Sequence, residues 1–131
     1  MESILTSIKK LLGIEADYEH FDTDLIIHIN SVFMILTQIG IGPPEGFVIE
    51  DDSATWSDFL DETELVNLSA VKSFVHLKVR LLFDPPTGSV AESMNKLLSE
   101  LEWRLYIIAD NTRIDEEGGQ NGEQLYGYWD D

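Results

Sequence analysis

The sequence predicts a mainly α-helical domain, a small bundle of about four to five helices with an irregular acidic loop and a flexible C-terminal tail. Apolar residues recur every three or four positions in four separate stretches, which is the helical period. Glycine, proline and polar capping residues stand at the ends of these stretches. A chain of 131 residues also suits one domain whose core needs no metal or crosslink.

The first two helices are expected in the N-terminal third of the chain. Helical spacing of apolar residues continues to Leu12, and Gly13 follows at a typical C-terminal cap position. The second helix is expected to begin with Asp22 or Thr23 as its N-cap and to run to about Ile39. Its apolar residues cover most of its circumference, so we expect it to be buried on several sides.

The least regular segment is "EGFVIEDDSATWSDFLDETE", residues 45–64. Phe47 to Ile49 are compatible with a short extended segment. The sequence "TWSD" is a capping box in which Thr55 caps a short helix and Asp58 bonds back to the cap. The acidic run lacks the DxDxDG order and the closing Glu of a calcium loop, so a solvated loop is favoured over a calcium site.

A third long helix is predicted from Glu64 to about Phe83, where a proline corner stops it. Pro85 disfavours the helical conformation for Asp84, and Pro86 has no amide hydrogen to continue the helix. Half of the four prolines in the chain lie at this corner. The sequence therefore indicates a defined angle between this helix and the next.

The last helix is predicted to restart directly after the corner. Gly88 permits a positive φ, and "SVAE" is a second capping box with Ser89 as the cap and Glu92 as its partner. We expect one apolar stripe to pack back against the preceding helix, since a single helix is not stable alone. The stripe comprises Val90, Met94, Leu97, Leu98, Leu101, Leu105 and Ile108.

The domain is expected to span residues 1–113, followed by an acidic flexible tail over residues 114–131. The tail is rich in Gly, Asp, Glu, Gln and Asn and has no apolar period. Its Tyr126, Tyr128 and Trp129 are unusual for a solvated tail and are candidate contacts with a partner.

Three residues of the domain are further candidate contacts with another copy or a partner: Trp56, Trp103 and Arg104. Trp103 lies off the apolar stripe of the last helix, on the side that carries Lys96. Two alternatives are open for Trp103, because aromatic residues near helix ends usually join the local core, whereas interfaces are enriched in exposed tryptophan.

Charge and residue usage exclude several classes of function. The chain has 8 Lys and Arg against 25 Asp and Glu, a net charge of −17, and no basic residue between Lys10 and Lys72. This charge disfavours binding to nucleic acid or to anionic lipid. The most apolar run, Leu25 to Ile41, is shorter than a membrane span and contains polar residues, so no membrane contact is expected.

No pattern of residues argues for an enzyme, a cofactor or a metal. The chain has no cysteine, and His20, His28 and His76 are not at metal-ligand spacing. The GxSxG, P-loop and GxGxxG motifs are absent. We therefore expect a structural or binding protein without catalytic activity.

Three stretches together resemble the head-tail connector (adaptor, or head-completion) proteins of long-tailed bacteriophages and prophages. They are "FDTDLIIHINSVFMILTQIGIGP", "TWSDFL" and "VKSFVHLKVRLLFDPPTGSVAESMNKLLSELEWRL", which cover most of the chain from the second helix to Arg104. The most specific parts are "LKVRLLFDPP" and "ELEWRL". By this resemblance Phe83, Asp84, Pro85 and Pro86 form the structural corner. The following helix signature comprises Glu100, Glu102, Trp103, Arg104 and Leu105.

The resemblance implies a subunit of a ring beneath the portal vertex of the DNA-filled head. The implied partners are the portal protein, the next connector or tail-completion protein, and other copies of the same chain. DNA passes through such a ring without being specifically bound, and the implied location is the virion, after synthesis in the host cytoplasm. The resemblance is compatible with a free monomer that assembles only on the portal.

Two other functions are alternatives. The acidity alone suggests a DNA mimic that inhibits a host DNA-binding protein, although much of the acid lies in loops and helix caps rather than along one surface. The helical fold alone is compatible with a small regulatory or enzyme-accessory domain.

Overall fold

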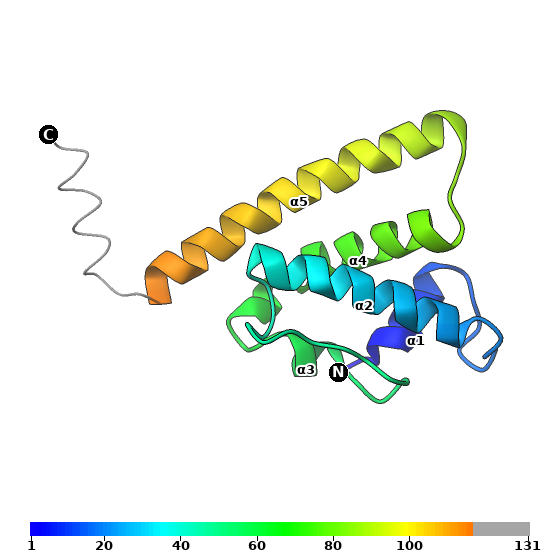
Figure 1. Cartoon of the computed structure of the whole chain (residues 1–131), viewed down its shortest axis with the longest axis horizontal. Coiled ribbons are helices and arrows are strands. Elements are labelled where there is room, and N and C mark those ends of the chain that lie inside the picture. Colours follow the sequence, from blue (N-terminus) through cyan, green and yellow to red (C-terminus); the bar gives the residue numbers. More distant parts are fainter. Residues whose placement is uncertain (117–131) are drawn as a thin grey trace, which may run out of the picture.

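Helices make up nearly all of the regular structure among the described residues (Figure 1). This computed structural model describes the backbone of residues 1–116 and the side chains of residues 1–111. The elements in chain order are α1 (Ile4–Leu11), α2 (Asp22–Ile39), α3 (Trp56–Phe59), the 3-10 helix η1 (Glu64–Asn67), α4 (Leu68–Phe83) and α5 (Gly88–Glu116). The predicted helical class is confirmed. The predicted domain boundary at residue 113 falls inside α5, and residues 117–131 of the predicted tail lie outside the described residues.

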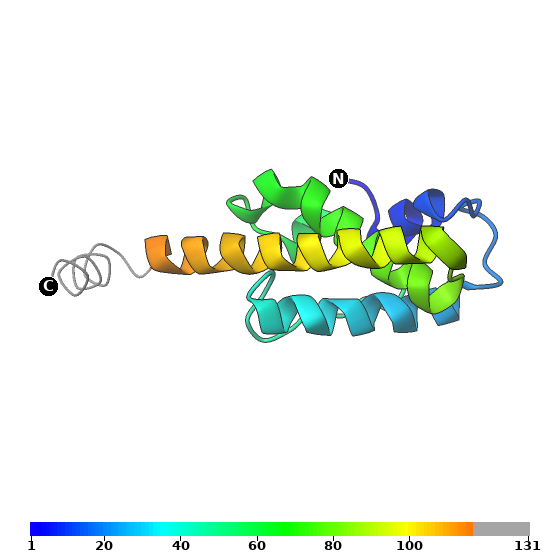
Figure 2. The same cartoon turned by 90° about the horizontal axis from the view of Figure 1, so that it is seen from above.

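α4 is the central helix, packed mainly against α2 and α5. α5 runs back over α4 after the corner (Figure 1), and seen from above α2 lies along one side of α5 while α1 and η1 lie on the other (Figure 2). The core joins these helices through fully buried side chains. From α2 and α4 these include Leu25, Ile29, Val32, Phe33, Leu36, Val71, Phe74, Val75 and Val79.

Both ends of α1 are capped, and the C-terminal cap at Gly13 is the one that the sequence predicts. Ser3 precedes the helix, and its hydroxyl accepts a hydrogen bond from the amide of Thr6 at 3.2 Å. Gly13 has a φ of 80°, and the next amide, of Ile14, donates to the carbonyl of Lys9 at 2.8 Å. This arrangement satisfies a carbonyl that the helix end leaves free.

The predicted N-cap of α2, Asp22 or Thr23, is wrong. Phe21 occupies the cap position without a side-chain hydrogen bond, and Asp22 is the first residue of the helix. The Asp22 carboxylate instead forms an ion pair with Lys9 at 2.8 Å. Lys9 is only 2% exposed, so its ammonium group competes for this carboxylate far more strongly than the backbone amides do.

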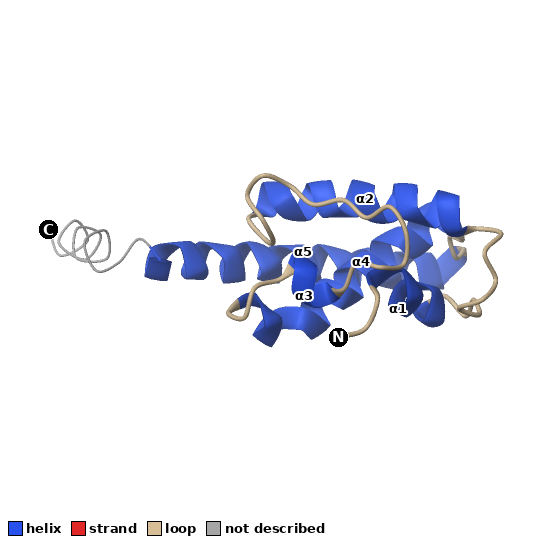
Figure 3. Cartoon of the chain, turned by 90° about the horizontal axis from the view of Figure 1, so that it is seen from below, coloured by secondary structure: helices blue, strands red, loops and turns tan. Residues whose placement is uncertain are grey.

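The segment between α2 and α3 holds its shape through side chains rather than strand pairing. The extended segment expected at residues 47–49 is not a strand, and the described residues contain only one isolated bridge, between Ser3 and Thr55. Asn30 on α2 bonds both backbone groups of Ile49, at 3.0 and 2.8 Å. Seen from below, this loop lies beside α2 (Figure 3).

The capping box before α3 is confirmed, with Thr55 as the cap and Asp58 as its partner. The amide of Thr55 donates to the Asp58 carboxylate at 2.8 Å. In the acidic run, Asp51 accepts from the amide of Ser53 at 2.8 Å. Within the described residues, no group of three His, Asp or Glu is placed to hold a metal ion.

Candidate functional site

The proline corner ends α4 where the sequence predicts, but α5 restarts earlier than expected. α4 ends at Phe83, and Asp84 leaves the helical region with φ −145° and ψ 71°. Gly88 has a φ of 64°, a conformation that favours glycine. α5 begins at Gly88 itself, so Ser89 lies in its first turn and the predicted capping position is wrong. The positive φ of Gly88, rather than a serine cap, marks the change of direction.

The corner is anchored to the start of α2. Phe83 and Phe21 are both partly buried against the core, and their rings meet edge to face with centroids 5.1 Å apart. Phe21 also contacts the rings of Tyr18 and His20. The position from which α5 departs is therefore fixed by aromatic packing as well as by the prolines.

The apolar stripe of α5 is covered along only part of its length. Leu98 and Leu105 are buried, as is Ala109, which the sequence did not single out. Near the corner, however, Val90 is 57% exposed and Leu97 46% exposed. The contact of α5 with α4 confirms that the helix packs back, but it leaves Val90 and Leu97 of the predicted stripe exposed. The two helices diverge towards the corner (Figure 1), and this leaves the first turns of α5 uncovered.

The opposite side of α5 exposes aromatic and aliphatic side chains near its C-terminal half. Trp103 is 62% exposed, Tyr106 48% and Ile107 38%; we call these three residues the α5 aromatic surface. Next to it, Arg104 and Glu100 form an ion pair at 2.8 Å, with both side chains more than half exposed. Of the two alternatives for Trp103, the exposed position is the one observed.

Two residues of the α5 aromatic surface are not predicted from the sequence, and one predicted contact residue, Trp56, is buried elsewhere in the fold. Tyr106 and Ile107 were not singled out, although both lie well away from the apolar stripe around the helix. Trp56 was expected to contact a partner, but it is fully buried and its indole nitrogen donates to the hydroxyl of Ser7 at 2.8 Å. That expectation is therefore corrected. The remaining aromatic candidates, Tyr126, Tyr128 and Trp129, lie outside the described residues.

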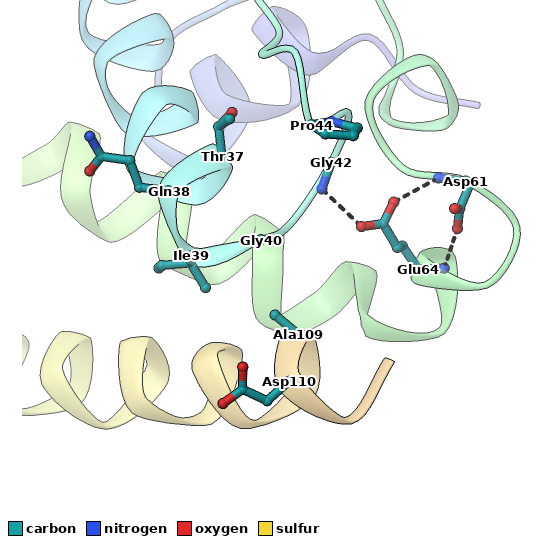
Figure 4. A pocket seen from close by; sticks show the side chains of 10 residues that line it. All are labelled: Thr37, Gln38, Ile39, Gly40, Gly42, Pro44, Asp61, Glu64, Ala109 and Asp110. Atoms are coloured by element: carbon teal, nitrogen blue, oxygen red, sulfur yellow. Dashed lines mark hydrogen bonds between the residues drawn. The ribbon is translucent and has the colours of Figure 1, made fainter. Parts of the chain in front are cut away.

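An open pocket of about 560 Å³ lies where the end of α2, the loop after it, η1 and α5 meet (Figure 4). Two of the carboxylates that line it, those of Asp61 and Glu64, form hydrogen bonds within the fold. The amides of Gly42 and Asp61 donate to the two oxygens of Glu64 at 2.8 and 3.2 Å, and the amide of Glu64 donates to the Asp61 carboxylate at 2.8 Å. These bonds hold the loop after α2 against η1. The carboxylates of Asp61 and Glu64 therefore stabilise the fold at this pocket.

The fold changes the acid-base chemistry of His76 on α4. Burial lowers its pKa below the ordinary value, and the neighbouring Arg80 guanidinium adds to this shift. A hydrogen bond with the backbone of Leu11 opposes it. The hydrogen bond with Leu11 places His76 at the contact between α4 and α1.

Comparison with known proteins gives one match. The family described as phage connector protein matches residues 4–112, which takes in every helix described above except the last turn of α5. A search of curated proteins and a search of solved structures each found no match. Among the described residues, no helix is long and apolar enough to cross a membrane.

Proposed function

The chain belongs to the phage connector protein family, and from this premise we propose that it joins the DNA-filled head of a phage or prophage to the tail. The observation that carries the proposal is the family match over residues 4–112. The exposed α5 aromatic surface supports it, because a structural connector needs sites for protein partners and aromatic residues are enriched at such sites. In this proposal the chain lies at the head-tail junction of the virion.

In this proposal several copies form a ring beneath the portal and extend the channel through which DNA passes. The net charge of −17 per copy supports a channel to which DNA does not adhere. A ring multiplies any acidic surface on its inner wall, and such a surface repels the phosphates of the duplex. Specific binding of DNA is not part of the proposal.

The α5 aromatic surface is proposed as a contact with the portal or with the next connector protein. A tryptophan that is 62% exposed gains apolar burial when a partner covers it. Arg104, paired with Glu100 beside this surface, is a candidate for its polar rim. The aromatic residues of the C-terminal segment are proposed as a second contact that orders on a neighbouring protein.

The proposal is tested by binding the purified full chain to DNA-filled heads that lack it. Heads prepared from a lysate without the gene are mixed with the chain and separated by sedimentation. We expect the chain to sediment with the heads, and Trp103→Ala to reduce this binding, whereas Val66→Ala, at a residue 84% exposed on η1, leaves it unchanged. A chain that stays free of the heads but inhibits a host DNA-binding protein would favour the DNA-mimic alternative.

A further inference from the structure

Two pairs of large apolar side chains remain exposed on the helical body. On α2, Ile27 is 58% exposed and Met34 60%, and on α5, Val90 is 57% exposed and Leu97 46%. We call the first pair the α2 ridge and the second pair the α5 ridge. In each ridge the two residues are seven positions apart, about 10.5 Å along the helix axis. The two ridges therefore match in spacing.

The two ridges lie on different sides of the molecule. Successive residues of a helix are rotated by about 100° around its axis. Around the circumference of α5, Ala109 is therefore followed by Leu98, then by Leu105 and then by the α5 ridge. Ala109 is next to the end of α2, because a Cβ placed on Gly40 would lie 3.3 Å from the Ala109 Cβ. The α5 ridge is thus on the flank of α5 turned away from α2, the side on which Figure 2 shows α1. Within one chain the ridges cannot meet.

Charge differs in sign between these two sides. α2 contains no lysine or arginine, and Asp24 is exposed one turn before Ile27. On the other side, Lys10 is exposed on α1. Lys72 and Arg80 lie along the flank of α4 that meets α1, where Lys72 pairs with Glu2 at 2.9 Å. An exposed acid, Asp24, therefore borders the α2 ridge, and an exposed base, Lys10, lies on the side of the α5 ridge.

We propose that the α2 ridge of one copy docks on the α5 ridge of the next copy. The occupant of each ridge is a second copy of this chain, because the two ridges match in apolar spacing and the exposed side chains of Asp24 and Lys10 put opposite charges on their two sides. Two different surfaces in contact make a heterologous interface, and such an interface repeats from copy to copy until a ring closes. The proposal rests on the proposed ring and assigns the two faces that build it.

Cysteine cross-linking tests this contact in the full chain. The chain has no cysteine, so Met34→Cys and Leu97→Cys each place a single thiol on one ridge. Both side chains are exposed, so we expect the variants to fold, which circular dichroism checks. Each variant is treated with a short bis-maleimide cross-linker in two states. In one the protein is free in solution at high concentration, and in the other it is bound to phage heads. The control carries Val66→Cys with Leu97→Cys, because Val66 is exposed but lies outside both ridges.

A heterologous contact predicts a distinct pattern on a denaturing gel. The double variant Met34→Cys/Leu97→Cys gives a ladder of dimers, trimers and longer products, whereas an equal mixture of the two single variants gives dimers only. Each single variant alone, and the control, gives monomers. Dimers from Met34→Cys alone would indicate a symmetric contact and overturn the proposal.

The heads separate this proposal from the proposed function. A double variant that binds heads without giving a ladder overturns the assigned faces and leaves the connector function standing. A ladder in solution with no binding to heads supports the faces and contradicts the connector function. Absence of both the ladder and the binding contradicts both.

Discussion

Phe83, the last residue of α4, packs edge to face against Phe21, the residue before α2, with ring centroids 5.1 Å apart. This contact joins the proline corner, which follows α4, to the residue that precedes α2. It fixes the point from which α5 departs and therefore the separation of the two ridges. The angle at the corner thus depends on tertiary packing as well as on local backbone chemistry.

A double-mutant cycle measures this coupling. Phe21→Leu and Phe83→Leu each remove an aromatic ring while keeping an apolar side chain. We expect a coupling free energy of about 0.5–1.5 kcal/mol between the two sites, the usual value for an aromatic pair. The measurement is urea unfolding of the wild-type chain and the three variants. Strictly additive effects would show that the two rings do not stabilise each other.

The buried ammonium group of Lys9 is predicted to be essential to the connection between α1 and α2. It donates to the carbonyls of Ala16 and Tyr18 at 3.0 and 2.7 Å and pairs with Asp22 at 2.8 Å. Lys9→Met leaves these acceptors without their donor, and we expect a loss of about 3–5 kcal/mol in the free energy of unfolding. Lys10→Met, at an exposed neighbour, should change it by less than about 0.5 kcal/mol. Equal effects of the two substitutions would contradict the assigned role.

Two glycines with positive φ in the loop after α2, Gly42 and Gly46, allow the cost of a steric clash to be separated from the cost of backbone strain. Gly46 has a φ of 99° and open space around it, so Gly46→Ala should cost only the backbone strain, about 1–2 kcal/mol. Gly42 has a φ of 81°, and a Cβ there would overlap the ring of Phe59. Gly42→Ala should therefore lower the midpoint of thermal unfolding further than Gly46→Ala. The reverse order would mean that the loop moves away from Phe59 at little cost.

Stability is predicted to respond to pH through His76. Burial and Arg80 lower the pKa of His76 in the folded chain below its ordinary value of 6.5. Below pH 6.5 the unfolded chain therefore binds a proton that the folded chain does not, and stability falls until the pH reaches the folded pKa. Between about pH 7.5 and about pH 5.5, the wild-type chain should lose stability relative to His76→Gln. Parallel curves for the two proteins would contradict this role of His76.

Trp103 is predicted to contribute to assembly and not to folding. Because its side chain is 62% exposed, Trp103→Ala should change the free energy of unfolding by less than about 0.5 kcal/mol. The same variant should lose most of the head-joining activity of the wild-type chain, whereas Val66→Ala should keep it. Unfolding in urea and head-tail joining are measured on the same preparations. A variant that is strongly destabilised, or that joins heads to tails normally, would contradict this assignment.

The parts of the fold that the sequence predicts are those with local chemical signals. Thr55 and Asp58 form the expected capping box, Gly13 has the expected positive φ, and α4 ends at Phe83 before the two prolines. Each signal involves residues only a few positions apart. Local backbone preferences alone are therefore sufficient to place these boundaries.

The failures involve contacts between residues far apart in the sequence. Asp22 was expected to cap α2, but the buried Lys9 binds its carboxylate. Asn30 on α2 bonds both backbone groups of Ile49 in the loop, a contact that the sequence does not predict. Trp56 was expected at an interface, but Ser7 provides a buried partner for its indole. No local pattern specifies these partners, because each depends on how the helices pack.

Electron microscopy of the parent phage or prophage with the gene deleted tests most directly whether this chain connects heads to tails. We expect filled or leaking heads beside separate tails, and joined particles once the purified wild-type chain is added. Trp103→Ala, added in the same amount, should join far fewer. Normal particles in the absence of the gene would contradict the connector function.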